Sequence, residues 1–113
     1  MIKIGWKCLK VDSRGEMVSA IHVPGVVYPL HEVTRPRRGC GPLTVFKTLK
    51  VAEHFGEYFG LNVRKVAYSP LKGKARWYKA YGCASITVPP SFHSILIPDP
   101  NLVDPAEEVV RLE

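Results

Sequence analysis

The sequence predicts one α+β domain: mainly antiparallel β-sheet, with one amphipathic helix and a short C-terminal helix. Apolar and polar residues alternate in several short stretches, which is typical of half-buried strands. Only residues 49–59 space their apolar residues along one helical face. The chain has 113 residues, which suits a single domain with one core. We therefore assign residues 1–113 to one domain.

The first part of the chain predicts a β-hairpin over residues 2–23. Apolar residues alternate with lysine and glycine from Ile2 to Cys8, which places the lysines on the solvent face. Residues 12–15, Asp-Ser-Arg-Gly, suit a tight turn, and residues 16–23 then return as the second strand. A Pro-Gly turn follows and leads into an extended segment at residues 26–30.

Residues 34–42, Thr-Arg-Pro-Arg-Arg-Gly-Cys-Gly-Pro, predict a stiff basic loop. Prolines lack the N–H that a helix or central strand needs, and glycines favour tight backbone turns. The loop presents Arg35, Arg37 and Arg38 to solvent, which makes these three arginines our first candidate binding residues. Cys40 lies beside them, and nearby cations favour its thiolate form, so a reactive thiol is an alternative to a structural one.

The clearest element is a helix over residues 49–59. A short β segment at 43–47 precedes it, Thr48 suits the N-cap, and Gly60 suits a left-handed end. We expect the aromatic residues of this helix to pack in the core: Phe55, Tyr58 and Phe59.

The second half predicts further strands and a second basic loop. Residues 61–69 read as a strand whose alternation slips at Arg64–Lys65, which indicates a bulge or a strand covered on both faces. A basic loop at 70–75 is followed by a long extended stretch at 76–88 and a last strand at 92–97.

The C-terminal segment predicts a short helix over residues 105–112. Asp104-Pro105-Ala106-Glu107 matches a capping box with proline at the first helical position.

Charge is divided unevenly along the chain. Residues 1–93 carry 15 Lys and Arg against 5 Asp and Glu, whereas residues 94–113 form an acidic segment with a net charge of −4. The whole chain has a net charge of +6, and its basic part favours polyanionic partners such as nucleic acid or an acidic protein surface. The alternative is a basic protein without a specific anionic partner. The acidic segment either covers part of the basic surface or improves solubility.

A second candidate binding segment interleaves cations with aromatic residues, an arrangement that suits phosphate contacts and base stacking. Its residues are Lys72, Lys74, Arg76, Trp77 and Lys79. The alternative is that the aromatic rings belong to the core and the cations form an ordinary solvated face.

Several chemistries lack their sequence patterns. Three dispersed cysteines form neither a disulfide framework nor a zinc motif, and no phosphate-binding glycine motif occurs, so we predict no metal and no cofactor. The N-terminus has no secretion signal and no apolar run reaches membrane-spanning length, so we expect a cytoplasmic protein. His31–Glu32, beside the basic loop, is a candidate acid/base pair, with exposed or structural residues as the alternative, and we assign no catalytic residue.

The segment Thr34 to Phe55 resembles small uncharacterised proteins of archaea, bacteria and their viruses. The resemblance rests on Thr-Arg-Pro-x-x-Gly-Cys-Gly-Pro-Leu-x-Val-Phe, followed by Thr-Leu-x-x-Ala-x-x-Phe. The same layout is distantly similar to ADP-ribosyltransferase-type folds. The Glu-x-Glu motif typical of those enzymes is missing, so the resemblance implies their fold and not their catalysis.

These observations favour a non-enzymatic binding protein, of a viral or accessory regulatory kind, that engages nucleic acid or an acidic protein through its two basic segments. A nucleotide-binding or ADP-ribosyltransferase-like protein, active or degenerate, is the first alternative. A structural or assembly protein is the second.

Overall fold

The computed structural model describes residues 1–19, 26–36, 43–70 and 102–113. Its elements, in chain order, are β1 (Lys3–Val11), β2 (Met17–Ser19), β3 (Val33–Thr34), β4 (Leu43–Phe46), α1 (Leu49–Phe59), β5 (Asn62–Pro70) and β6 (Val103–Arg111). The predicted α+β class, with mainly antiparallel strands and one amphipathic helix, is confirmed.

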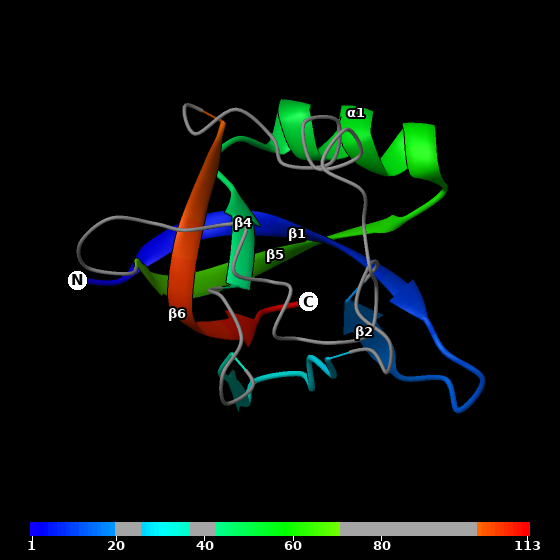
Figure 1. The fold of residues 1–113 in the computed structure, drawn as a ribbon, viewed down its shortest axis with the longest axis horizontal. Coiled ribbons are helices and arrows are strands. Elements are labelled where there is room, and N and C mark those ends of the chain that lie inside the picture. The colour runs from blue at the N-terminus through cyan, green and yellow to red at the C-terminus, as the bar shows by residue number, and fades with distance from the viewer. Residues whose placement is uncertain (20–25, 37–42, 71–101) are drawn as a thin grey trace, which may run out of the picture.

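The strands close into a small barrel. β1 pairs with β5 on one edge and with β4 on the other, and β6 also pairs with both β5 and β4. These four strands therefore form a circuit, in which every pairing is antiparallel. β2 extends the β4 edge of β1, and β3 pairs with the last part of β6 (Figure 1).

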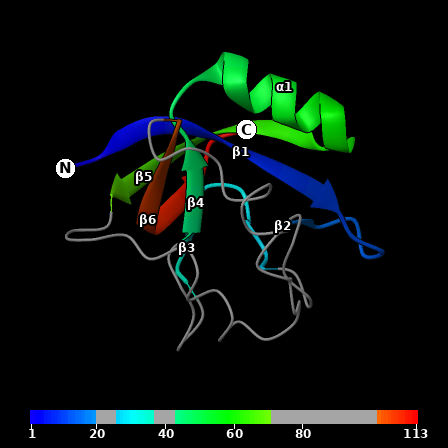
Figure 2. The same ribbon diagram turned by 45° about the horizontal axis from the view of Figure 1, so that its top comes forward.

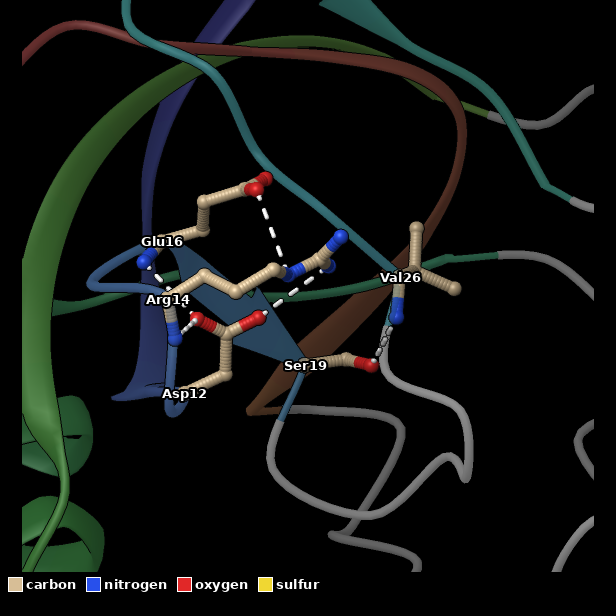
Figure 3. Close-up of polar contacts among 5 residues, drawn as sticks. All are labelled: Asp12, Arg14, Glu16, Ser19 and Val26. Carbon is tan, nitrogen blue, oxygen red and sulfur yellow. Dashed lines mark hydrogen bonds and ion pairs between the residues drawn. The ribbon is translucent and has the colours of Figure 1, made fainter.

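The predicted turn between β1 and β2 is confirmed. Asp12 Oδ1 accepts the backbone N–H groups of Arg14 and Glu16, each at 2.9 Å (Figure 3). Gly15 takes the left-handed conformation with φ of 80°. The Asp12 carboxylate replaces ladder hydrogen bonds at the point where the chain reverses, and so fixes the hairpin register.

The predicted helix and both of its caps are also confirmed. Thr48 Oγ1 accepts the backbone N–H of Val51, and Gly60 ends the helix with φ of 66°. Figure 2 shows α1 lying across the outer side of β1 and β5. Gly56 permits this close approach, because an added Cβ there would lie 2.8 Å from Val63 Cγ2.

Two hydrophobic clusters lie on opposite sides of the barrel wall. The first fills the interior and contains Leu9, Val26, Tyr28, Leu43, Val45, Val66, Tyr68, Ala106 and Val109. The second lies between the wall and α1 and centres on Cys8, Phe46, Ala52 and Val103. Because both faces of β1 and β5 are covered, their apolar residues point to both sides.

Residues 105–112 do not form the predicted helix, because residues 103–111 are strand β6. The capping signal is local, whereas β6 gains ladder partners on β4, β5 and β3. The carboxylate of Asp104, the expected cap, instead accepts the Tyr68 hydroxyl at 2.6 Å. The valines of β6 also favour a strand.

One smaller prediction resolves to its second alternative and another needs correction. At Arg64–Lys65 the strand is covered on both faces and has no bulge against β1, because Val63 packs toward α1, Val66 packs into the interior, and the β1–β5 register runs without a break. The irregularity of β5 lies instead in its pairing with β6, at Ser69/Pro70. Figure 1 shows β6 bending along its length, as expected where a bulge interrupts the ladder. On α1, Phe55 packs against the core, but Tyr58 is 79% exposed and Phe59 is 44% exposed.

Candidate functional site

Of the candidate binding residues, the structure describes only Arg35. Its guanidinium is exposed and forms an ion pair with Glu108 on β6. The other candidates, together with the extended stretches expected at 76–88 and 92–97, lie outside the described residues: Arg37, Arg38, Lys72, Lys74, Arg76, Trp77 and Lys79.

The two basic segments join the barrel on opposite sides of one residue. Leu43, which follows residues 37–42, pairs with Ala106 from the β4 side. Pro70, which precedes residues 71–101, pairs with Ala106 from the β5 side. Neighbouring strands lie about 5 Å apart, so Leu43 and Pro70 are separated by only about 10 Å across β6.

A polar cluster lies close to these attachment points, and we call it the Asp104 cluster. It consists of Asp104, Tyr68, Lys3 and Lys47. The carboxylate of Asp104 accepts the Tyr68 hydroxyl and lies 3.7 Å from Lys3 Nζ and 3.4 Å from Lys47 Nζ. The Lys47 backbone N–H also donates to the Leu102 carbonyl, at the point where residues 71–101 rejoin the described chain.

The electrostatics of the Asp104 cluster favour the charged carboxylate. Partial burial alone would raise the pKa of Asp104, but the Tyr68 hydroxyl and the two ammonium groups outweigh it and lower that pKa. Burial, followed by the hydrogen bond to Asp104, raises the pKa of Tyr68. Asp104 therefore stays ionised and holds two exposed lysines in place, so the cluster carries a net charge of +1.

Most of the net positive charge lies outside the described residues. The described ranges contain ten Lys and Arg against nine Asp and Glu, which leaves a net charge of +1. The remaining residues, 20–25, 37–42 and 71–101, contain six Lys and Arg against one Asp, and so contribute a net charge of +5 to the total of +6. The excess charge therefore belongs to the segments attached beside Ala106.

A third basic feature lies inside the barrel. Lys7 is only 8% exposed, its Nζ donates to the Thr44 carbonyl at 2.7 Å, and the ammonium lies 4.8 Å from the centre of the Tyr28 ring. Burial lowers the pKa of Lys7 from 10.5 to about 8. The alternation of β1 had indicated a solvent-exposed lysine here, so the structure corrects that prediction.

Catalytic and metal-binding groups are sparse in the described ranges. Among those residues, no three His, Cys, Asp or Glu side chains lie close enough together to hold a metal ion. Cys8 is buried, its Sγ donates to the Ala52 carbonyl, and burial raises the pKa of this thiol to about 11, as expected for an unreactive packing residue. His31 is exposed and has φ of 62°.

The sequence did not identify the Asp104 cluster. Lys3 had been placed on a solvent face, whereas Asp104 had been assigned to a helix cap. The only sequence signal was a carboxylate next to a proline, which resembles many helix starts. Ladder pairing of β6 with β4 and β5 is what brings these side chains together.

Comparisons with known proteins add no assignment: no family model, curated protein or solved structure gave a significant match to this chain. In the described residues there is also no helix with the length and apolar character needed to span a bilayer.

Proposed function

We propose that this protein binds nucleic acid through a basic surface organised along β6. The observation that carries the proposal is the attachment of both basic segments on either side of Ala106. Segments that leave the barrel about 10 Å apart can contact the same stretch of phosphate backbone, which carries one phosphate per about 3.4 Å of helix axis along each strand.

The described cations beside these attachment points support the same surface. Lys3 and Lys47 in the Asp104 cluster, and Arg35 just after β3, all contact carboxylates of β6. Their side chains are exposed by 46%, 39% and 68%, respectively, so each can reach a phosphate without disturbing the core. β6 thus acts as the strand around which the basic groups are arranged.

The binding expected from this arrangement is mainly electrostatic. Each phosphate contact releases condensed counterions, so affinity should fall steeply as salt rises, with a slope that reports the number of contacts. A base-stacking contribution from Trp77 would add affinity for single strands, because an unpaired base offers its face to an aromatic ring.

The test is fluorescence anisotropy with labelled single- and double-stranded DNA and with RNA, across a salt series. The variant Arg35→Ala/Arg37→Ala/Arg38→Ala should bind more weakly, and the slope of log affinity against log salt should become less steep by about 2 to 3. The control is Lys50→Ala, which removes an exposed cation from α1.

Two results would contradict the proposal. One is no binding to any nucleic acid at low salt, which would turn attention to an acidic protein partner. The other is an unchanged affinity and salt slope in the triple variant.

A further inference from the structure

Besides the lysines of the Asp104 cluster, three basic residues among the described ranges share the inner face of the barrel, and we call them the inner cations: Lys7, Arg64 and Arg111. Lys7 lies directly opposite Arg64 in the β1–β5 register. Arg111 lies directly opposite Val66 in the β5–β6 register, and Val66 is fully buried in the interior cluster. Directly opposed residues of an antiparallel pair share one face, so all three side chains leave the backbone toward the interior.

The inner cations belong to neighbouring positions. Arg64 and Val66 are two residues apart on β5, so Arg64 and Arg111 are diagonal neighbours, with backbones about 7 to 8 Å apart. Lys7 lies over the ring of Tyr28. Leu30, two residues after Tyr28, forms a β-bridge with Arg111, so the segment that contacts Lys7 also contacts the strand that carries Arg111.

Their hydrogen bonding is incomplete. Arg64 Nη1 donates to the Val63 carbonyl at 2.9 Å. The Nε of Arg111 is buried and has no hydrogen-bond partner among the described residues. None of the inner cations forms an ion pair with a carboxylate of the described residues, and the nearby Glu113 side chain instead accepts the Lys65 backbone N–H.

This arrangement is costly for a protein on its own. Like charges directly opposite on neighbouring strands destabilise a sheet, and a buried donor without an acceptor loses its hydration without compensation. An anion placed between the guanidinium groups would reverse both effects. Guanidinium groups match the geometry of tetrahedral oxyanions, to which they donate paired hydrogen bonds.

We propose that Arg64 and Arg111 form a binding site for a compact oxyanion of the phosphate type, with Lys7 supplying a third positive charge from the barrel interior. The site is distinct from the nucleic-acid surface. Arg64 lies near the start of β5 and Pro70 at its end, and this separation of six positions along the strand spans about 20 Å. The oxyanion is either free phosphate or the phosphate group of a small metabolite.

The first test observes Arg111 directly in the unsubstituted protein. In a ¹⁵N-edited NMR titration at constant ionic strength, inorganic phosphate should shift the arginine Nε–H resonance that the Arg111→Lys variant lacks, and the shift should saturate. Chloride at the same ionic strength should produce no saturable shift. The absence of a saturable shift with phosphate would overturn the proposal, whatever the variants do.

The second test uses calorimetric titration of matched variants. Arg64→Gln and Arg111→Gln should each bind phosphate about tenfold more weakly or worse, as expected for loss of a charge-assisted hydrogen bond. Lys50→Gln, which removes an exposed cation from α1, should bind like the unsubstituted protein. Equal affinity in all three variants would overturn the site assignment.

Further arms of the same titration identify the ligand class. Tighter binding of adenosine monophosphate than of inorganic phosphate would indicate a metabolite phosphate, whereas equal binding would indicate the free ion; both support the site. Acetate that binds as tightly as phosphate would overturn the assignment to a phosphate-type oxyanion. Anisotropy with nucleic acid should be unchanged in Arg64→Gln and Arg111→Gln, so this proposal and the proposed function can fail independently.

Discussion

Replacing Lys7 by methionine should stabilise the protein at neutral pH and remove a rise in stability between pH 7 and 9. Lys7 has a pKa of about 8 in the folded chain because it is buried, against 10.5 when solvated. Folding therefore favours the neutral amine. The cost of burying the charge is complete below pH 8 and disappears above pH 10.5, so the stability contributed by this group increases with pH.

The pKa values set the magnitude. A difference of 2.5 pH units corresponds to about 3 kcal/mol between the two limits, of which about 1 kcal/mol falls between pH 7 and 9. Methionine has a similar length and no charge, but it leaves the Thr44 carbonyl without the Lys7 donor, which costs about 1 kcal/mol. We therefore expect Lys7→Met to be more stable than the unsubstituted protein by about 2 kcal/mol at pH 7.

The assay is urea unfolding at several pH values from 7 to 9. The upper limit matters because the pKa of Cys8 is raised to about 11, so its stabilising contribution is lost as pH rises from 9 to 11. Comparing Lys7→Met with the unsubstituted protein at each pH cancels the contributions that Cys8 and the other shared titratable groups make to the free energy of unfolding. Lys50→Met, at an exposed position of α1, should keep the pH dependence of the unsubstituted protein. A stability difference between Lys7→Met and the unsubstituted protein that stays constant from pH 7 to 9 would refute the reasoning.

Two further predictions concern the surface and the core. Glu108→Gln should release Arg35 from its ion pair and raise nucleic-acid affinity several-fold, whereas Glu107→Gln removes the same charge from the neighbouring exposed residue and should have a smaller effect. Equal gains in the two anisotropy titrations would show that only net charge matters. Gly5→Ala should destabilise the protein by about 1 to 3 kcal/mol in urea unfolding, because an added Cβ would overlap Val45 Cγ1 in the barrel interior. A loss below about 0.5 kcal/mol would show that this interior contact relaxes freely.

The elements that the sequence predicted well depend on neighbouring residues. The helix over 49–59 combines an apolar face with Thr48 and Gly60 at its ends, and each of these signals acts within one helical turn. The turn at Asp12 depends in the same way on hydrogen bonds from Arg14 and Glu16. The local structure that these residues favour also forms in the folded protein, because no described strand from a distant part of the chain pairs with these segments in a competing conformation.

The prediction of a C-terminal helix was wrong because residues 103–111 pair with strands from distant parts of the chain. The Asp-Pro-Ala-Glu motif at residues 104–107 favours a helix start, but β6 closes the barrel and gains hydrogen bonds on both edges. An isolated short helix would be marginal by comparison. The prediction lacked the identity of the strands beside β6, which local sequence does not carry.

The candidate site was predicted only in part. Composition identified Arg35 as an exposed loop cation, and the structure places it there beside Glu108. Neither the Asp104 cluster nor the inner cations were predicted, because an alternating pattern separates two faces of a strand without saying what covers each face. In a flat sheet with one solvated face, Lys7 would be exposed. In the closed barrel the same face of β1 points into the interior, so Lys7 is buried.

The hairpin turn and the helix with its caps could be read from the residues alone, because short-range hydrogen bonds and helical periodicity control them, and the uneven distribution of charge follows directly from composition. Three other features appear only in the folded barrel: β6 is a strand, the two basic segments attach on either side of Ala106, and Lys7 is buried. These features depend on strand pairs between residues far apart in the chain, whose free energy comes from closing the barrel and burying its interior.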